Sequence, residues 1–326
     1  MSLRRAIAIL FGLAVLAALA LGVSTLCGST GCLHASLDSD LVRMLRLPRV
    51  LAAFAVGGLL AVSGALMQVL LRNPLADPYV LGLSGGAAAG ALLAMLGALQ
   101  IGLAPDGAAG IGAATGAAAA VLLLFGLARR PLRHLSLGPQ VVGHRLILTG
   151  VMIASGFGAL ITLLLSLAPD AQLRGMIFWL LGDLEGHRYL APAWIVLVAA
   201  LCWAVFNARK LNMLARGESF AQLLGVPVLR LRVTTLCVAS IATAAAVTVA
   251  GTIGFVGLVV PHAIRLLFGN DQRLLLPAAA LAGGSVLTLA DLAARTVVAP
   301  TQLPVGVITA LAGVPVFLWL LSRSRA

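Results

Sequence analysis

Ten long apolar stretches, separated by short polar gaps, follow one another along this 326-residue chain. A helix needs about 20 apolar residues to cross a hydrocarbon core of roughly 30 Å. The predicted helices are residues 6–27, 50–71, 80–103, 108–128, 146–168, 190–207, 233–251, 253–268, 274–295 and 303–321. Pro261, His262 and Arg265 make the stretch 253–268 the least regular of them. The pattern predicts an all-α, polytopic membrane protein of about ten transmembrane helices.

The basic residues fall mainly in alternate gaps. With the amino terminus in the cytoplasm, the inner gaps hold 16 of the 22 Lys and Arg residues: Arg4, Arg5, Arg72, Arg129, Arg130, Arg133, Arg145, Arg209, Lys210, Arg216, Arg230, Arg232, Arg265, Arg273, Arg323 and Arg325. The outer gaps hold Arg43, Arg46, Arg49, Arg174, Arg188 and Arg295. Cytoplasmic loops carry an excess of Lys and Arg. We therefore expect a multi-pass protein of the bacterial inner (plasma) membrane with both termini cytoplasmic.

The composition excludes a soluble globule. Hydrophobic residues make up 61% of the chain, charged residues only 10%, and the mean hydropathy is +1.09. This leaves too little polar surface to face water. The net charge of +12 could suggest nucleic acid, but such binding needs basic residues clustered on one face. Because they are dispersed among short loops, we expect no nucleic-acid partner.

We treat residues 1–326 as a single transmembrane domain, since no long polar linker divides the chain. Arg4 and Arg5 before the first apolar stretch could mark a signal peptide, but its apolar core is longer than a signal peptide requires. A retained helix is favoured. Cys27 and Cys32 then lie outside, where they either form a disulfide or remain free thiols.

Glycines recur at intervals of four in two neighbouring stretches. Gly82, Gly86 and Gly90 belong to one, and Gly112 and Gly116 to the next. Small residues at this spacing give a helix a flat stripe that lets another backbone approach closely. We interpret both stripes as helix-packing surfaces, since a glycine stripe serves packing far more often than it lines a pore.

The gap 38–49 carries Arg43, Arg46 and Arg49 at every third position. A helical turn would gather them into an outward-facing basic cluster. Ordinary anchoring by arginines that snorkel to the membrane interface explains the same pattern.

The segment Asn73-Pro74-Leu75-Ala76-Asp77-Pro78 interrupts the apolar pattern, and its two prolines prevent a continuous helix. Irregular backbone at membrane depth survives only against protein or a water-filled cavity. The segment is either the edge of a gate or a plain cytoplasmic turn.

The longest inner gap, 208–232, is a cytoplasmic loop within the domain. It contains Glu218, Ala221 and Gly225, followed by Pro227. Residues 218–224 read as a short amphipathic helix that ends at the glycine and proline. Such a helix either docks into a groove on another protein or rests on lipid. On the outer side, the turn 170–188 with its aromatic pair Phe178 and Trp179 predicts a further short helix.

Catalytic motifs are absent from the sequence. Lys210 is the only lysine, and no phosphate-binding G-x-x-x-x-G-K-[ST] loop occurs. No metal-binding spacing of His, Cys or Asp is present either, so we expect no enzyme, no cofactor and no metal site. Asp291 and Arg295 can pair on one helix face, and we interpret His262 as a satisfied packing residue. Uphill transport would need an ion gradient or a separate ATPase.

Several motifs together resemble the FecCD-type permeases of type II ABC importers, which carry vitamin B12, haem or iron-siderophores. They cover nearly the whole chain in the expected order: Arg46-Leu-Pro-Arg49, Ser63 to Gln68, Asn73 to Pro78, Leu81 to Ala87, Phe178-Trp179 with Gly182, Leu224-Gly-Val-Pro227, Gly254 to His262, Leu303 to Gly306 and Gly313 to Phe317. The resemblance implies the permease fold of those importers.

The resemblance also implies partners and site residues. The partners are a second copy of the chain, two cytoplasmic ABC ATPase subunits and a periplasmic substrate-binding protein. By position, Arg46, Arg49 and Arg295 would accept glutamates of the binding protein, a sound role for guanidinium groups. Asn73 and Leu75 would narrow the inner gate. The loop 208–232 would be a cytoplasmic coupling loop, with Glu218, Ala221, Gly225 and Pro227 as the residues that couple to the ATPase.

Two questions stay open at this level. Ferric siderophore, haem and cobalamin permeases share these motifs, so the metal chelate is undetermined. A self-powered secondary transporter is the alternative, and it would need a buried coupling acid at a broken helix. Asp77 is the one candidate for that acid.

Overall fold

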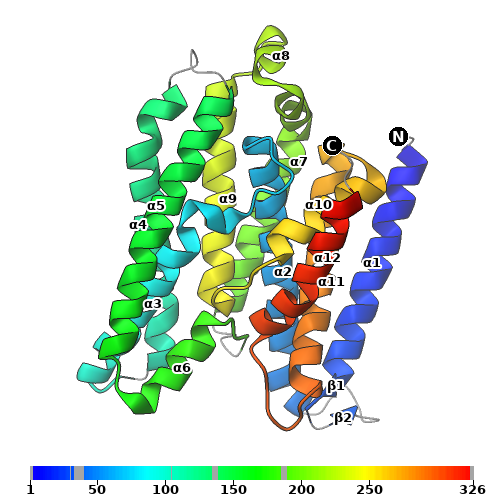
Figure 1. Cartoon of the computed structure of the whole chain (residues 1–326). Helices are drawn as coiled ribbons and strands as arrows, with labels where there is room; N and C mark the ends of the chain where they lie inside the picture. Colours follow the sequence, from blue (N-terminus) through cyan, green and yellow to red (C-terminus); the bar gives the residue numbers. More distant parts are fainter. Residues whose placement is uncertain are drawn as a thin grey trace.

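The computed structural model describes residues 3–29, 31–32, 40–103, 105–133, 139–184 and 189–323, and they form a bundle of roughly parallel and antiparallel helices (Figure 1). The long helices are α1 (Leu3–Leu26), α2 (Leu47–Leu70), α3 (Leu83–Gln100), α4 (Pro105–Arg133), α5 (Pro139–Leu167), α7 (Leu190–Arg216), α9 (Val228–Ala250), α11 (Gln272–Thr296) and α12 (Val305–Arg323). The shorter ones are η1 (Leu41–Arg46), η2 (Pro78–Leu81), α6 (Asp170–Leu180), α8 (Glu218–Leu223) and α10 (Val256–Phe268).

Within the described residues, eight helices are long and apolar enough to cross a membrane, and Val256–Phe268 and Val305–Leu320 are shorter apolar helices. Together they match the ten predicted stretches one for one, so the predicted fold class is confirmed. The irregular stretch 253–268 shortens to the 13-residue α10. A helix of that length is too short to span the core alone. Its interior Pro261 supplies no N–H to the helix.

Helix α2 is the centre of the bundle. Every residue from Ala52 to Leu70 is buried, and the helix packs on α7, α9, α10 and α11. Gly57 and Gly64 permit the closest approaches, because a Cβ at Gly64 would lie 1.7 Å from the Gly257 carbonyl oxygen. A helix enclosed on all sides has no polar face, which explains why Ser63 and Gln68 are the only polar residues between Ala52 and Leu70.

The two predicted glycine stripes lie on α3 and α4, and these helices pack against each other. A Cβ at Gly90 would lie 2.1 Å from the Gly112 carbonyl oxygen, and one at Gly116 would lie 2.1 Å from that of Gly86. The prediction is wrong for Gly82, which precedes α3 with a φ of 78° and packs on Ile153 of α5. The error arises because the four-residue spacing extends the helix back to Gly82, whereas α3 begins at Leu83.

The two ends of the bundle differ. Figure 1 places both chain termini and α8 at one end, which we call the α8 end, and β1, β2 and α6 at the other, the β end. The strands β1 (Cys27–Gly28) and β2 (Gly31–Cys32) pair so that Cys27 lies opposite Cys32, and Cys27 is disulfide-bonded. The short helix predicted in the turn 170–188 is α6; residues 185–188 lie outside the described part.

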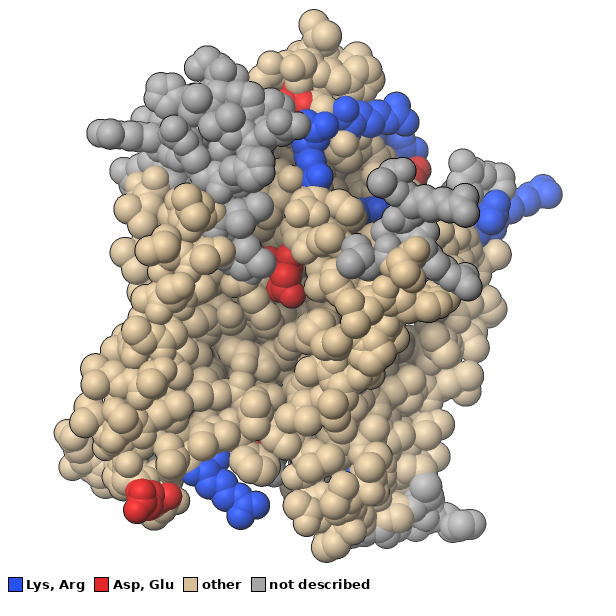
Figure 2. Space-filling view, in the orientation of Figure 1, with Lys and Arg blue, Asp and Glu red and all other residues tan. Residues whose placement is uncertain are grey.

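Charged side chains gather at the two ends of the molecule and are nearly absent from the middle of the face in Figure 2. Blue arginine and lysine side chains are most numerous near the α8 end. This is the end that the alternation of basic residues assigns to the cytoplasm.

Candidate functional site

Two of the predicted binding residues, Arg49 and Arg295, meet at the β end around one carboxylate. Asp291 of α11 is fully buried, and its Oδ1 lies 2.9 Å from Nε of Arg49. Its Oδ2 lies 2.9 Å from Nε of Arg295, one helical turn along α11. The predicted pairing of Asp291 with Arg295 is confirmed. Two cations therefore share one anion, and the cluster keeps a net positive charge.

Arg46 holds the adjoining turn. Its guanidinium donates to the carbonyl oxygen of Leu26 at 2.6 Å and to that of Gly31 at 3.4 Å. Arg49 also donates to Gln302 Oε1 at 2.8 Å. Arg46 and Arg295 are only 6% and 4% exposed. The structure thus brings the three predicted docking arginines together, with Arg49 the most accessible of them.

The gate candidate begins where α2 ends. Asn73 N donates to the Gln68 carbonyl and Arg72 N to that of Val69, while Arg72 adopts a φ of 49°. This is the pattern of a Schellman helix end, a place where glycine is usual. An arginine is therefore held in a strained backbone conformation.

Asn73 shapes the turn that follows. Its Oδ1 accepts a hydrogen bond from Leu75 N at 2.9 Å. The Leu75 side chain is partly exposed next to this turn. The residues predicted for the gate thus lie on a fixed, non-helical segment between α2 and η2.

Asp77 caps η2, because its Oδ1 accepts from Tyr79 N at 2.8 Å. Burial raises the pKa of the Asp77 carboxyl, and this hydrogen bond opposes the shift. Tyr79 OH in turn accepts from Ile253 N, which ties the segment to the break between α9 and α10. Composition and motif analysis missed Tyr79, since one tyrosine in an apolar segment gives no pattern.

His262 departs from expectation. Its side chain is buried, as predicted, but neither ring nitrogen has a hydrogen-bond partner among the described residues. The expectation of a satisfied histidine is wrong, because α10 packs it among apolar helices.

Helix α8 projects from the end of the bundle (Figure 1) and was predicted to within one residue. Its inner side buries Ala221 and Glu218, and Glu218 forms an ion pair with Arg232 of α9. Gly225 ends the segment with a φ of 76°, and Pro227 precedes α9. The opposite side exposes Phe220 and Leu223 by 42% and 87%.

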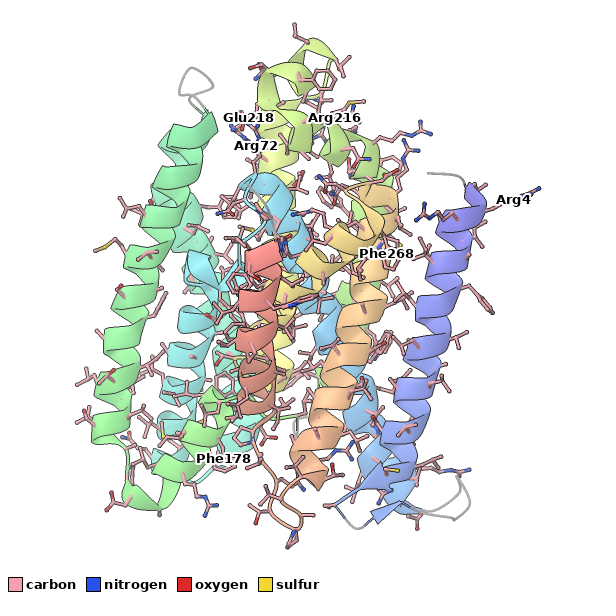
Figure 3. All side chains as sticks on the ribbon, turned by 45° about the vertical axis from the view of Figure 1, so that its right-hand side comes forward. Arg4, Arg72, Phe178, Arg216, Glu218 and Phe268 are labelled. Carbon is pink, nitrogen blue, oxygen red and sulfur yellow. The ribbon has the colours of Figure 1, made fainter. Side chains whose placement is uncertain are left out.

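Arg72 connects α8 with the gate candidate. Figure 3 shows Arg72 and Glu218 close together at the α8 end, and the Arg72 charge acts on Arg232. Neither Arg72 nor Arg232 was singled out from the sequence. A single arginine at the end of an apolar stretch looks like any other interfacial charge.

Residues 6–323 match the profile of the FecCD transport family. The chain belongs to this family. It is 42% identical over 286 residues to the vitamin B12 import system permease protein BtuC of Escherichia coli O9:H4 (strain HS), covering 87% of this chain and 84% of the relative. The same values hold for BtuC of Shigella boydii serotype 18 (strain CDC 3083-94 / BS512).

Solved structures share the fold. An inward-facing conformation of a metal-chelate type ABC transporter has a TM-score of 0.84 at 29% identity, covering 98% of this chain and 99% of that one. PsaBC from Streptococcus pneumoniae in complex with Fab has a TM-score of 0.58 at 17% identity, covering 87% and 91% of the two chains. The second likeness concerns the fold alone.

Proposed function

We propose that this FecCD family member is the membrane permease subunit of a binding-protein-dependent ABC importer. Two copies form the pathway of a metal chelate across the bacterial inner membrane, and two separate cytoplasmic ATPase subunits drive it. The similarity to BtuC permeases along 87% of the chain carries this proposal. The ten apolar helices and the metal-chelate transporter that shares their arrangement support it.

In this proposal the α8 end faces the cytoplasm. The support is the concentration of basic residues near that end, as the positive-inside rule requires. Both chain termini lie at the same end and are then cytoplasmic. The β end, with the disulfide-bonded Cys27, faces the oxidising periplasm.

Helix α8 is the proposed contact with the ATPase. The apolar side chains of Phe220, Leu223 and Leu224 are exposed at the end of the bundle. Exposure of such a group of apolar side chains to water is unfavourable and indicates that a partner protein covers them. Its buried side is fixed to α9 through Glu218 and Arg232. A force on the exposed side can therefore reach the bundle.

The inner gate is proposed at residues 71–77. Arg72 lies beside the Glu218–Arg232 pair, so a displacement of α8 changes the electrostatic surroundings of the segment that carries Asn73 and Leu75. Movements of α8 that are driven by ATP hydrolysis can therefore affect the gate directly. The pathway then opens alternately to the cytoplasm and to the periplasm. The ATPase drives the change, because it binds one of these two conformations more tightly than the other.

At the β end, Arg49 is the proposed contact with a glutamate of the binding protein. Asp291 holds its guanidinium in place, and Arg295 shares that carboxylate from the other side. Arg46 supports the neighbouring turn by its two backbone contacts. Arg46 and Arg295 then contribute positive charge and positioning, with Arg49 making the direct contact.

Cobalamin is the substrate to test first, because the relatives of 42% identity are vitamin B12 permeases. Haem and ferric siderophores are the other chelate classes of this proposal. In the experiment, the chain is assembled with its ATPase subunits, and the binding protein is added empty or loaded with each chelate in turn. We expect the loaded cobalamin-binding protein to stimulate ATP hydrolysis most. Stimulation by another loaded chelate reassigns the substrate, and no stimulation by any of them contradicts the importer.

A further inference from the structure

A basic pocket of about 490 Å³ lies at the α8 end, between the last turns of α7 and the turn from α10 to α11. Its polar lining consists of Arg209, Asn212, Arg216, Asn270, Asp271 and Arg273. Three arginines thus surround one carboxylate. The residues that line this pocket are not those of the docking cluster, the gate candidate or α8 described above.

Hydrogen bonds hold the floor of the pocket in place. Asn212 Nδ2 donates to Asp271 Oδ1 at 2.8 Å, and Asn212 Oδ1 accepts from Gln272 N at 2.9 Å. Asp271 Oδ1 also accepts from Arg273 N at 3.1 Å, which caps α11. The carboxylate is therefore occupied with fixing α7 to α11.

The arginines keep their charge available. Among the residues that the structure describes, neither Arg209 nor Arg216 forms an ion pair, and Arg273 Nε lies 4.0 Å from Asp271 Oδ1, at the limit for one. All three side chains are exposed. The pocket has a net positive charge that a phosphate group can neutralise.

The depth of the pocket matches a lipid headgroup. Arg209 directly follows the apolar part of α7, and Arg273 directly precedes the apolar run of α11 that begins at Leu274. Arginines at such boundaries lie at the level of the headgroups. A phospholipid carries its phosphate at this level.

One face of α7 continues the pocket toward the membrane interior. Ile195, Val198, Cys202 and Val205 are exposed at alternating spacings of three and four residues, and Ile195 is 68% exposed. The same spacing continues through Arg209, Asn212 and Arg216. Residues at this period share one helix face. The face is therefore apolar along its length and basic at one end.

We propose that this pocket binds the phosphate of an anionic phospholipid of the phosphatidylglycerol type, with an acyl chain along the apolar face of α7. Guanidinium groups bind phosphate oxygens through paired hydrogen bonds. Basic pockets between transmembrane helices recognise anionic headgroups in this way. The site goes beyond the proposed transport function, because neither the transported chelate nor the exposed side of α8 takes part in it.

The test is native mass spectrometry of the full-length chain in detergent, titrated with phosphatidylglycerol or with phosphatidylethanolamine of the same acyl chains. We expect phosphatidylglycerol to bind about 25-fold more tightly, since the three arginines and Asp271 leave a net charge of +2 and each net positive charge near the headgroup contributes about fivefold. The triple variant Arg209→Gln, Arg216→Gln, Arg273→Gln should lose this preference. Equal binding of the two lipids by the unaltered chain overturns the proposal.

The matched control replaces three exposed arginines at the same end, Arg4, Arg5 and Arg230, with glutamine. It removes the same charge and should keep the preference. If the control variant loses the preference for phosphatidylglycerol as fully as the pocket variant does, general charge attraction explains the preference, and the proposed site is refuted. Inorganic phosphate at millimolar concentration should compete weakly, and complete displacement of the lipid by it reassigns the pocket to a soluble anion.

Asp271→Asn provides a second variant that does not depend on the triple one folding. Asparagine keeps a cap acceptor for Arg273 N while removing the single negative charge of the pocket. Phosphatidylglycerol binding should strengthen by about fivefold, with phosphatidylethanolamine binding unchanged. An unchanged or weaker preference for phosphatidylglycerol contradicts the site.

Discussion

Glu218 and Arg232 form an ion pair that fixes α8 to α9, and both side chains are buried. The pair leaves the apolar side of α8 exposed while anchoring its other side. This ion pair therefore links a contact made on the exposed side of α8 to α9.

Breaking this link should uncouple the permease. Glu218→Ala leaves the buried Arg232 unpaired, which costs about 3 kcal/mol of stability. We expect a lower thermal unfolding temperature in detergent and a loss of binding-protein-stimulated ATP hydrolysis in the assembled transporter. The double variant Glu218→Ala, Arg232→Ala should lose less stability than the sum of the single variants. Ser219→Ala, an exposed neighbour on α8, is the control and should behave as the unaltered chain.

Arg72→Gly should separate stability from coupling. Glycine relieves the left-handed backbone at this position, which stabilises the fold by about 1 kcal/mol. It also removes the charge beside Arg232, so we expect ATP-driven uptake to fall about fivefold or more. Arg72→Lys keeps both the charge and the strained backbone, and should retain uptake. A glycine variant with full uptake would exclude Arg72 from coupling.

The β end should respond differently to two substitutions. Asp291→Asn leaves Arg49 and Arg295 without their shared anion in a buried place, and should destabilise the chain by about 3 kcal/mol. Arg49→Ala removes the most accessible guanidinium and should weaken the affinity for the binding protein about tenfold or more, with a smaller loss of stability. Surface plasmon resonance with the immobilised chain measures the affinity, and thermal unfolding measures the stability. Unaltered affinity in the Arg49 variant would refute docking at this cluster.

Two glycines of α4 provide a test position and a control position for the packing of α3 on α4. A Cβ at Gly116 would lie 2.1 Å from the Gly86 carbonyl oxygen, whereas one at Gly126 meets nothing within 4 Å. Gly116→Ala should therefore destabilise the chain by about 1–3 kcal/mol. Gly126→Ala should be neutral or stabilise it by up to about 1 kcal/mol. Equal unfolding temperatures for the two variants would contradict the close approach of these helices.

Much of the fold could be predicted from the sequence, because apolar length and loop charge act locally. The boundaries of α8 followed from Glu218, Gly225 and Pro227, which are start and stop signals within ten residues. The spacing of Gly90 and Gly112 indicated helix-packing surfaces, but it did not show that these two surfaces meet. The short α10 was also visible in advance, since Pro261 and Arg265 interrupt its apolar stretch.

The contacts inside the sites could not be predicted, because they join residues far apart in the chain. The Arg49–Asp291 pair spans 242 positions and the Tyr79–Ile253 hydrogen bond spans 174. Nothing local marks Arg232 as the partner of Glu218. The burial of Arg46 and Arg295 likewise depends on how α1, α2 and α11 meet. The motifs predicted which arginines take part in docking. Which of these arginines is accessible and which are buried became clear only from the packing of the helices.

The central claim is that this chain provides a pathway whose energy comes from separate ATPase subunits. The most direct measurement is uptake of radiolabelled cobalamin into proteoliposomes that contain the chain alone or assembled with its ATPase and binding protein. We predict accumulation only in the assembled system supplied with ATP, and none for the chain alone under an imposed proton gradient. Accumulation by the chain alone under that gradient, abolished by Asp77→Asn, would contradict the claim and establish a self-powered transporter.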